Sequence, residues 1–153
     1  MMPASAAVDA ALRASQASPC RSKRGVAIWR GDTVLGVGHN RQPGGFRCTG
    51  DDACKASCAR TAIHAEQAAL LSSTGGIRGA EMLHVKTVDG LLVPSGGPSC
   101  LECSKLLLEA GIAGMWLYHE DGWRRYDALD FHTATLKHHG LPVVRSVAPG
   151  GRV

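Results

Sequence analysis

The chain has 153 residues, of which 44% are hydrophobic and 20% are charged, and its formal net charge is +4. No apolar run of the length needed to cross a bilayer occurs, so we expect no membrane span. The length suits one domain with a sizeable core, and we expect 1–153 to form a single domain. The modest basic excess is compatible with an anionic small molecule or nucleic acid, although a solvated basic surface is the simpler explanation.

The first 19 residues lack the apolar core of a secretory signal, so we expect a cytoplasmic protein. They predict an amphipathic N-terminal helix within 1–19 that ends at Ser18-Pro19. Disulfides are uncommon in proteins that are not secreted, and clustered cysteines then indicate metal binding or catalysis. Four of the six cysteines lie between Cys20 and Cys58, and the other two are Cys100 and Cys103.

Residues 25–40 predict a β-hairpin, because two apolar runs flank a short stretch with turn chemistry, "RGDT". Residues 40–58 are rich in glycine and cysteine and predict a long irregular loop. A helix is then expected from Ala59 to Ser73, where Gly75-Gly76 stops it.

Helices and strands alternate through the rest of the chain, which predicts an α/β sheet with helices on its faces. The expected order is a strand within 81–93, a helix over 100–111, a strand over 114–120, a helix over 128–140, a final strand over 141–147 and a flexible tail over 146–153. The sheet then has five strands. The helix before the final strand is long enough for a crossover, so the last two strands are expected to be parallel.

Two short motifs carry the chemistry: "HAE", which begins at His64, and C-x-x-C, which begins at Cys100. A helix start favours thiolates, so Cys100, Cys103 and His64 together offer three ligands for zinc. Three protein ligands leave the fourth position to water, which is typical of a catalytic rather than a structural site. Glu66 supplies the carboxylate that can take a proton from this water and pass it to a departing amine.

H-x-E followed by a C-x-x-C pair with a nearby proline resembles the signature of the zinc-dependent cytidine/deoxycytidylate deaminase superfamily. The resemblance runs from Ser18 to Leu141. Its blocks are similar to the deoxycytidylate (dCMP) deaminase branch: "SPCRSKRGVAIW", "VLGVGHNRQPGGFRC", "CARTAIHAEQAALL" and "CLECSKLLLEAGI". It implies a three-layer α/β/α cytidine-deaminase-like sandwich with a mixed sheet. The parallel last strand also fits that branch and the tRNA adenosine deaminases, whereas small cytidine deaminases use an antiparallel one.

The resemblance implies hydrolytic deamination of a cytosine-type base in a nucleotide or nucleoside. Zinc would be held by His64, Cys100 and Cys103, with Glu66 as the proton shuttle. The implied substrate contacts are the side chain of Asn40, the backbone around Ala65, Ser99 and the ring of Tyr118, which would stack on the base.

Two positions depart from the family pattern. Ser99 separates the proline from the first cysteine, and Ala68 stands where the family has an asparagine that helps to recognise nucleotide. These departures leave zinc hydrolysis intact but count against a nucleoside monophosphate as the substrate, and Ala68 does so most. The resemblance also implies a homo-oligomer in which loops of neighbouring subunits complete the site.

Some deoxycytidylate deaminases hold a second, structural zinc with cysteines in equivalent places. The matching residues here are Cys20, Cys48, Cys54 and Cys58, and His39 is an alternative ligand. Four thiolates would close a tetrahedral site and pin a long loop that has no core of its own. Buried free thiols are the alternative.

Two other functions remain open. Aromatic residues and arginines interleave between Trp116 and Tyr126, and such a segment could bind single-stranded DNA or tRNA by stacking. The same aromatic residues could instead face the core or a subunit partner. The chain could also be a non-catalytic zinc-binding subunit of the same fold.

Overall fold

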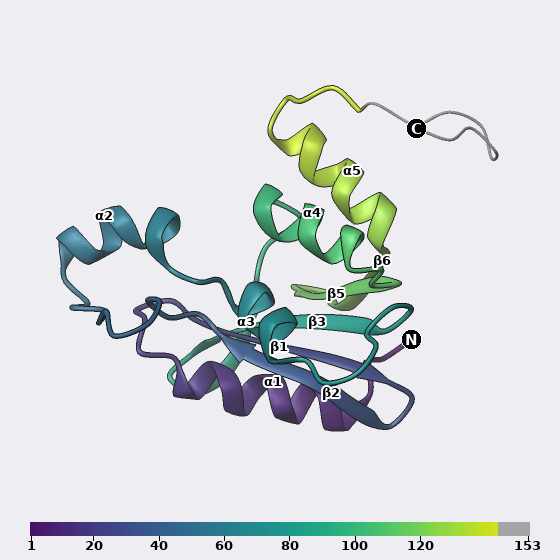
Figure 1. Cartoon of the computed structure of the whole chain (residues 1–153), viewed down its shortest axis with the longest axis horizontal. Helices are drawn as coiled ribbons and strands as arrows, with labels where there is room; N and C mark the ends of the chain where they lie inside the picture. Colours follow the sequence, from purple (N-terminus) through teal and green to yellow (C-terminus); the bar gives the residue numbers. More distant parts are fainter. Residues whose placement is uncertain (144–153) are drawn as a thin grey trace.

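The computed structural model describes residues 1–143 and shows a sheet covered by helices on both faces. The elements are α1 (Ser5–Ala17), β1 (Lys23–Arg30), β2 (Thr33–His39), α2 (Asp52–Thr61), α3 (Ala65–Ser72), β3 (Glu81–Val88), β4 (Leu91–Val93), α4 (Leu101–Glu109), β5 (Gly114–His119), β6 (Gly122–Asp127) and α5 (Ala128–His138). Helix α1 lies on one face of the sheet, and α3, α4 and α5 lie on the other (Figure 1). The three-layer α/β/α prediction is confirmed.

The strands run in the order β2-β1-β3-β5-β6, and β4 pairs with the last residues of β3. Strands β3 and β5 are parallel, whereas the other neighbouring pairs are antiparallel. The predicted mixed sheet is therefore confirmed, but it has six strands within residues 1–143 rather than five. The hairpin over 25–40 is confirmed as β1 and β2.

The structure adds a strand at the C-terminal end that sequence analysis missed. This strand, β6, begins at Gly122 and pairs antiparallel with β5. The predicted parallel pairing involved a later strand over 141–147. Asp-Gly is a hairpin signal, because glycine readily adopts the positive φ that a tight turn requires, and Gly122 has a φ of 107°. Of the strand expected over 141–147, the first three residues are irregular, and the remainder lies outside the described residues, as does the expected tail over 146–153.

The helix expected from Ala59 to Ser73 is divided in two. Ile63 and Arg41 form an isolated β-bridge, in which the Ile63 N–H donates to the Arg41 carbonyl at 2.7 Å. This bridge interrupts the helix and leaves His64 as the residue that precedes α3. The first part becomes α2, which begins inside the predicted loop because Asp51 accepts a hydrogen bond from the Cys54 N–H at 2.8 Å.

Helix α3 is seated directly on glycines of β2. A Cβ atom added at Gly38 would lie 2.3 Å from the Ala69 nitrogen, and one at Gly36 would lie 2.7 Å from the Ala69 carbonyl oxygen. The buried residues of α3 are alanines, which allows the same close approach from the helix side. The start of α3, which carries His64 and Glu66, is therefore fixed against the sheet.

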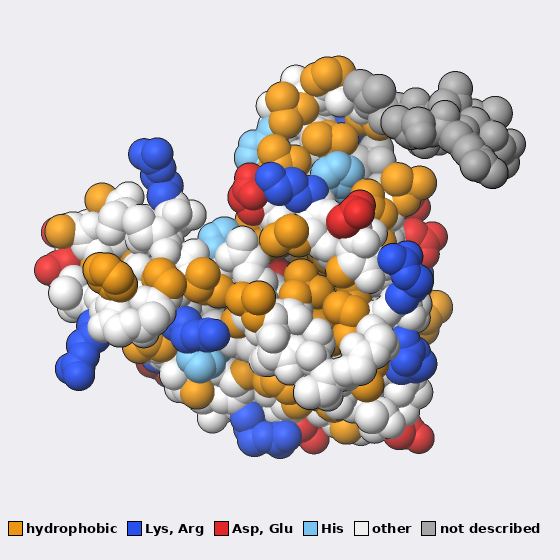
Figure 2. Space-filling view, viewed as in Figure 1, with side chains coloured by type: hydrophobic (Ala, Val, Ile, Leu, Met, Phe, Trp, Pro, Cys, Tyr) orange, Lys and Arg blue, Asp and Glu red, His pale blue; other side chains and the backbone are white. Residues whose placement is uncertain are grey.

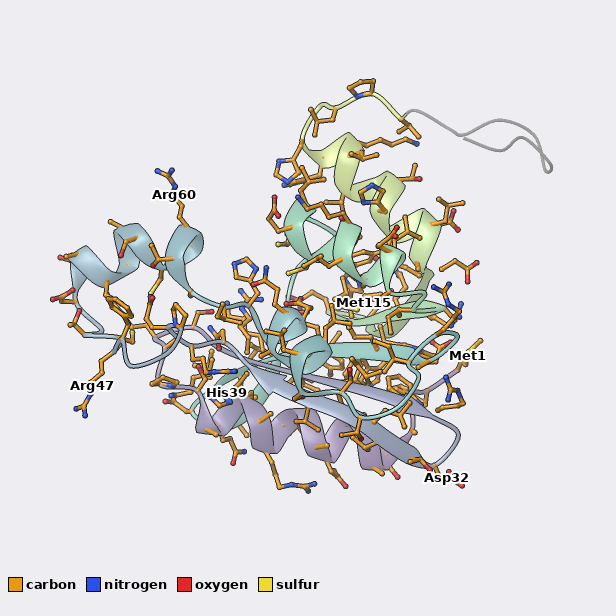
Figure 3. The ribbon with its side chains drawn as sticks, in the orientation of Figure 1. Met1, Asp32, His39, Arg47, Arg60 and Met115 are labelled. Carbon is orange, nitrogen blue, oxygen red and sulfur yellow. The ribbon has the colours of Figure 1, made fainter. Side chains whose placement is uncertain are left out.

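The sheet has an apolar core on each face. On the α1 face, alanines of α1 pack against Trp29, Leu83, Val85 and Trp116. On the opposite face, Val26, Ile28, Met82, Leu107, Met115 and Phe131 pack together, and Met115 lies between the sheet and α4 (Figure 3). None of the described helices is both long and apolar enough to cross a lipid bilayer.

Candidate active site

The predicted zinc ligands come together from two helix starts. His64 immediately precedes α3, Cys100 precedes α4, and Cys103 lies in the first turn of α4. The Nδ1 atom of His64 lies 3.3 Å from the Sγ atom of each cysteine. All three ligand atoms lie within 4.8 Å of one another.

This donor set fits a zinc ion. Tetrahedral zinc bonded to sulfur and nitrogen holds its ligand atoms about 3.5–3.8 Å apart. The observed separations of 3.3 Å are close to that range. Thiolate and imidazole ligands favour zinc over the hard cations calcium and magnesium, which prefer oxygen.

The three ligands also change each other's protonation. The pKa of Cys100 is lowered to about 4, first by the hydrogen bond from Cys103 and then by His64. The pKa of His64 is raised to about 9, mainly by Cys100, and the pKa of Cys103 is raised by the same thiolate. Metal ligation requires neutral imidazole and thiolates, so zinc binding here must release protons.

Glu66 lies beside these ligands in the first turn of α3. Its Oε2 atom lies 3.5 Å from the Sγ atom of Cys103. Its Oε1 atom lies on the other side, 4.0 Å from the Nε2 atom of His84, which is a residue of β3. Only 13% of the Glu66 side chain is exposed. The carboxylate therefore sits between the zinc-ligand cluster and the floor of the sheet.

These side chains line one cavity of about 660 Å³. Glu66 and all three predicted zinc ligands contribute to its wall, together with the predicted substrate contacts Asn40, Ala65 and Ser99. The cavity lies between α2 on one side and α4 and α5 on the other, where the surface in Figure 2 is notched. The structure thus brings most of the predicted site to one place.

Comparison with known proteins identifies the fold that carries this cavity. No family model and no curated protein matches the chain. Among solved structures, dCMP deaminase from the cyanophage S-TIM5 matches with 27% identity and a TM-score of 0.53, over 72% of this chain and 77% of that one. The same enzyme in complex with dCMP and dUMP matches with 28% identity and a TM-score of 0.54, over 70% of this chain and 74% of that one.

The chain has the cytidine/dCMP deaminase fold. A cytidine deaminase from Burkholderia pseudomallei agrees, with 20% identity and a TM-score of 0.57 over 85% of this chain and 96% of that one. The resemblance to the cytidine/dCMP deaminase superfamily inferred from sequence is confirmed, although the identities are low. These neighbours support a hydrolytic deaminase.

Asn40 has most of its hydrogen-bonding capacity taken within the deaminase fold. Its Oδ1 atom accepts from Ser18 Oγ at 2.7 Å and from the Arg24 N–H at 3.0 Å. Its Nδ2 atom donates to the Ser22 carbonyl at 2.6 Å. Asn40 therefore fixes the start of β1, and the bonds to Ser18, Ser22 and Arg24 use its side-chain oxygen and all but one of its amide hydrogens.

Tyr118 was expected to stack on the base, but it faces away from the cavity. Alternate residues of a strand point to opposite faces, and it is Leu117 that lines the cavity, together with Phe131 of α5. The Tyr118 ring packs edge-on against Trp123 of β6, with 5.3 Å between ring centroids. The register of the strand is therefore one residue away from the expected one.

Sequence analysis missed the cations of the cavity wall: Arg21, Arg24, Lys55 and Lys86. Arg24 and Lys86 are direct partners across the antiparallel β1–β3 pair, and like charges in that position repel. Neither has a carboxylate partner among residues 1–143. Burial lowers the pKa of Arg24. In the sequence, the "RSKR" cluster at residues 21–24 was the signal for two of these cations, Arg21 and Arg24. Not every arginine contributes, because Arg47 and Arg60 point away from the body of the molecule (Figure 3).

Three of the four remaining cysteines form a second cluster in the same wall. The Sγ atom of Cys54 lies 3.0 Å from that of Cys48 and 3.1 Å from that of Cys58. Cys20 lines the cavity but lies outside this cluster, with its Sγ atom 3.6 Å from the Asn40 carbonyl oxygen. His39, the alternative ligand, is on β2 and does not line the cavity.

Two side chains of the segment of aromatic residues and arginines, Arg125 and Trp116, make their contacts inside the fold. Arg125 forms a two-pronged ion pair with Glu81, with N–O distances of 2.9 and 2.8 Å. Trp116 is buried and donates to the same carboxylate at 2.7 Å. These contacts tie β6 to β3 and hold Arg125 and Trp116 inside the fold, so these two side chains are not free to stack on a base.

Proposed function

We propose that the chain is a zinc-dependent hydrolase that removes the amino group of a cytosine-type base in a nucleotide. The observation that carries this proposal is the meeting of His64, Cys100 and Cys103 with Glu66 in one cavity. The dCMP deaminase of cyanophage S-TIM5, which was solved with dCMP and dUMP, supports it by its similarity. Residues 1–153 are proposed to be one deaminase domain of a cytoplasmic homo-oligomer.

Zinc bound by these ligands would supply a water molecule whose pKa is lowered toward neutrality. Glu66 takes the proton from the attacking water and delivers it to the departing amine, a role that requires a carboxylate not engaged as a ligand. The Ala65 backbone and Leu117 form the wall against which a planar base can lie. The small exposure of the Glu66 side chain keeps bulk water from competing.

The cations of the cavity favour a nucleotide over a nucleoside. Arg24 and Lys86 repel each other across the β-ladder, and an anion placed between them relieves this cost. A 5′-phosphate is the anion that a nucleoside monophosphate would bring. The neutral sugar of a nucleoside offers these cations no partner.

The central test replaces Glu66 with glutamine, which preserves size and hydrogen bonding but cannot shuttle the proton. Ammonia release is measured with cytidine, deoxycytidine, their monophosphates, guanine and a cytosine-containing oligonucleotide. We expect activity on a cytosine monophosphate, and a loss of about 100-fold or more in kcat for Glu66→Gln with the zinc content unchanged. A wild-type protein that is inactive on every substrate would instead favour the non-catalytic subunit.

A second prediction concerns substrate choice. In Arg24→Gln and Lys86→Gln variants, we expect KM for the monophosphate to rise about tenfold, because each loses a charge-assisted hydrogen bond. KM for the corresponding nucleoside should not change. Equal effects on nucleotide and nucleoside would contradict the phosphate assignment. Lys105→Gln, on the exposed surface of α4 beside Glu102, is the matched charge control.

We also propose that Cys48, Cys54 and Cys58 hold a second, structural zinc, with Cys20 as the fourth ligand after a small movement. The mutual contacts of the three thiols support this proposal. A metal would also give α2 the stability that its packing lacks, because Cys54 is the one buried residue of this helix.

A further inference from the structure

His84 is a buried polar residue in the floor of the cavity, and neither the zinc site nor the proposed substrate contacts use it. It lies on β3, and its side chain is 8% exposed. On the same face of β3, Met82 packs in the apolar core and Lys86 reaches the cavity. A polar ring at this position needs a partner, because burying an unpaired polar group is costly.

Burial favours the neutral form of His84. Burial lowers its pKa most, Glu66 and Cys100 act in the opposite direction, and Arg24 and His64 add to the lowering. A neutral imidazole carries one N–H donor and one acceptor nitrogen. The Glu66 carboxylate lies 4.0 Å from Nε2. An ionised carboxylate only accepts hydrogen bonds, so the histidine nitrogen that faces it must be the donor.

The two oxygens of Glu66 have different neighbours. Oε2 lies 3.5 Å from Cys103, on the side of the zinc ligands, whereas Oε1 faces His84. A carboxylate that shuttles a proton must keep one oxygen aimed at the attacking water and then at the leaving group. A donor that holds the other oxygen would prevent the carboxylate from rotating away.

We infer that His84 is a positioning residue that holds Oε1 of Glu66, so that Oε2 faces the reacting atoms. This inference rests on the proposed deaminase function. The gap of 4.0 Å is longer than a hydrogen bond, and a movement of about 1 Å closes it. Catalytic hydrogen bonds are often long without substrate and shorten in the complex.

The test compares His84→Gln with His84→Asn. The glutamine amide nitrogen can occupy the place of histidine Nε2, whereas the asparagine amide nitrogen corresponds to Nδ1 and cannot reach Oε1. We expect His84→Gln to keep kcat within about fivefold of the wild type. We expect His84→Asn and His84→Leu to lose about 10- to 100-fold in kcat, because a displaced catalytic group costs that much. KM and zinc content should stay close to wild-type values.

The controls separate the possible outcomes. His119→Leu removes a histidine that bonds the Tyr126 hydroxyl outside the cavity, and it should leave kcat unchanged. Equal kcat for His84→Gln and His84→Asn, or a change confined to KM, would overturn the inference. If His84→Leu does not fold, the comparison of kcat between His84→Gln and His84→Asn still tests the inference. Wild-type inactivity would refute the proposed function itself, whereas an active wild type with unaffected His84 variants would refute this inference alone.

Discussion

Individual side chains in the cavity are tuned by their immediate neighbours. Cys103 and His64 lower the pKa of the Cys100 thiol, and burial lowers the pKa of His84. Each shift suits the proposed role of its residue, since zinc needs thiolates and a carboxylate needs a hydrogen-bond donor. The chemistry of the site therefore depends on contacts between β1, β3, α3 and α4 rather than on any one motif.

The buried His84 leads to a prediction about pH. Its pKa in the folded chain lies below the ordinary value of 6.5, so the unfolded state takes up a proton first as the pH falls. The free energy of unfolding must then decrease as the pH falls below about 6.5. We expect His84→Gln to lose less thermal stability than the wild type between about pH 7.5 and about pH 5.5, measured by circular dichroism. Parallel pH profiles for the two proteins would contradict this.

The zinc ligands and Glu66 could be proposed from sequence because their residue types and spacing are specific to the chemistry. The meeting of Arg24, His84 and Lys86 could not, because it depends on the pairing register of β1 with β3. The prediction that Tyr118 stacks on the base depended on the same kind of information. A shift of one residue along a strand moves a side chain to the other face of the sheet.

At the scale of elements, the position of α3 is decided by what it packs against. The sequence predicted one helix through His64, but pairing of Ile63 with Arg41 divides it. Local helix propensity could not reveal this division, because the bridge joins residues far apart in the chain. Strand β6, by contrast, could have been predicted, because the Asp121-Gly122 pair at its start is a hairpin signal in the sequence.

The contact between α3 and β2 gives a prediction that is specific to this element. Gly38→Ala places a methyl group 2.3 Å from the Ala69 nitrogen, so α3 must move. We expect a loss of about 1–3 kcal/mol in the free energy of unfolding, measured in urea, and a disproportionate loss of kcat. Gly76→Ala is the control, because nothing lies within 4 Å of its added Cβ atom. Similar activity for the two variants would show that α3 does not need this contact.

At the scale of the whole molecule, the two cysteine clusters share one cavity although they lie on different parts of the chain. The first joins α3 to α4 inside the body of the fold, where apolar cores already hold the helices. The second lies on α2 and the loop before it, and α2 projects from the body (Figure 1). Loss of metal should therefore affect the two clusters differently.

Metal analysis and hydrogen exchange test this difference together. We expect about two zinc ions per wild-type chain and about one in Cys54→Ser, because a structural site needs its full set of ligands. Chelation should speed exchange in α2 and the preceding loop, whereas β1 and β3 stay protected by the packed sheet. Cys54→Ser should show the fast exchange without a chelator and still retain the zinc bound through His64. Two zinc ions in Cys54→Ser, or equal protection of α2 with and without metal, would rule out a structural ion there and leave these cysteines as buried thiols.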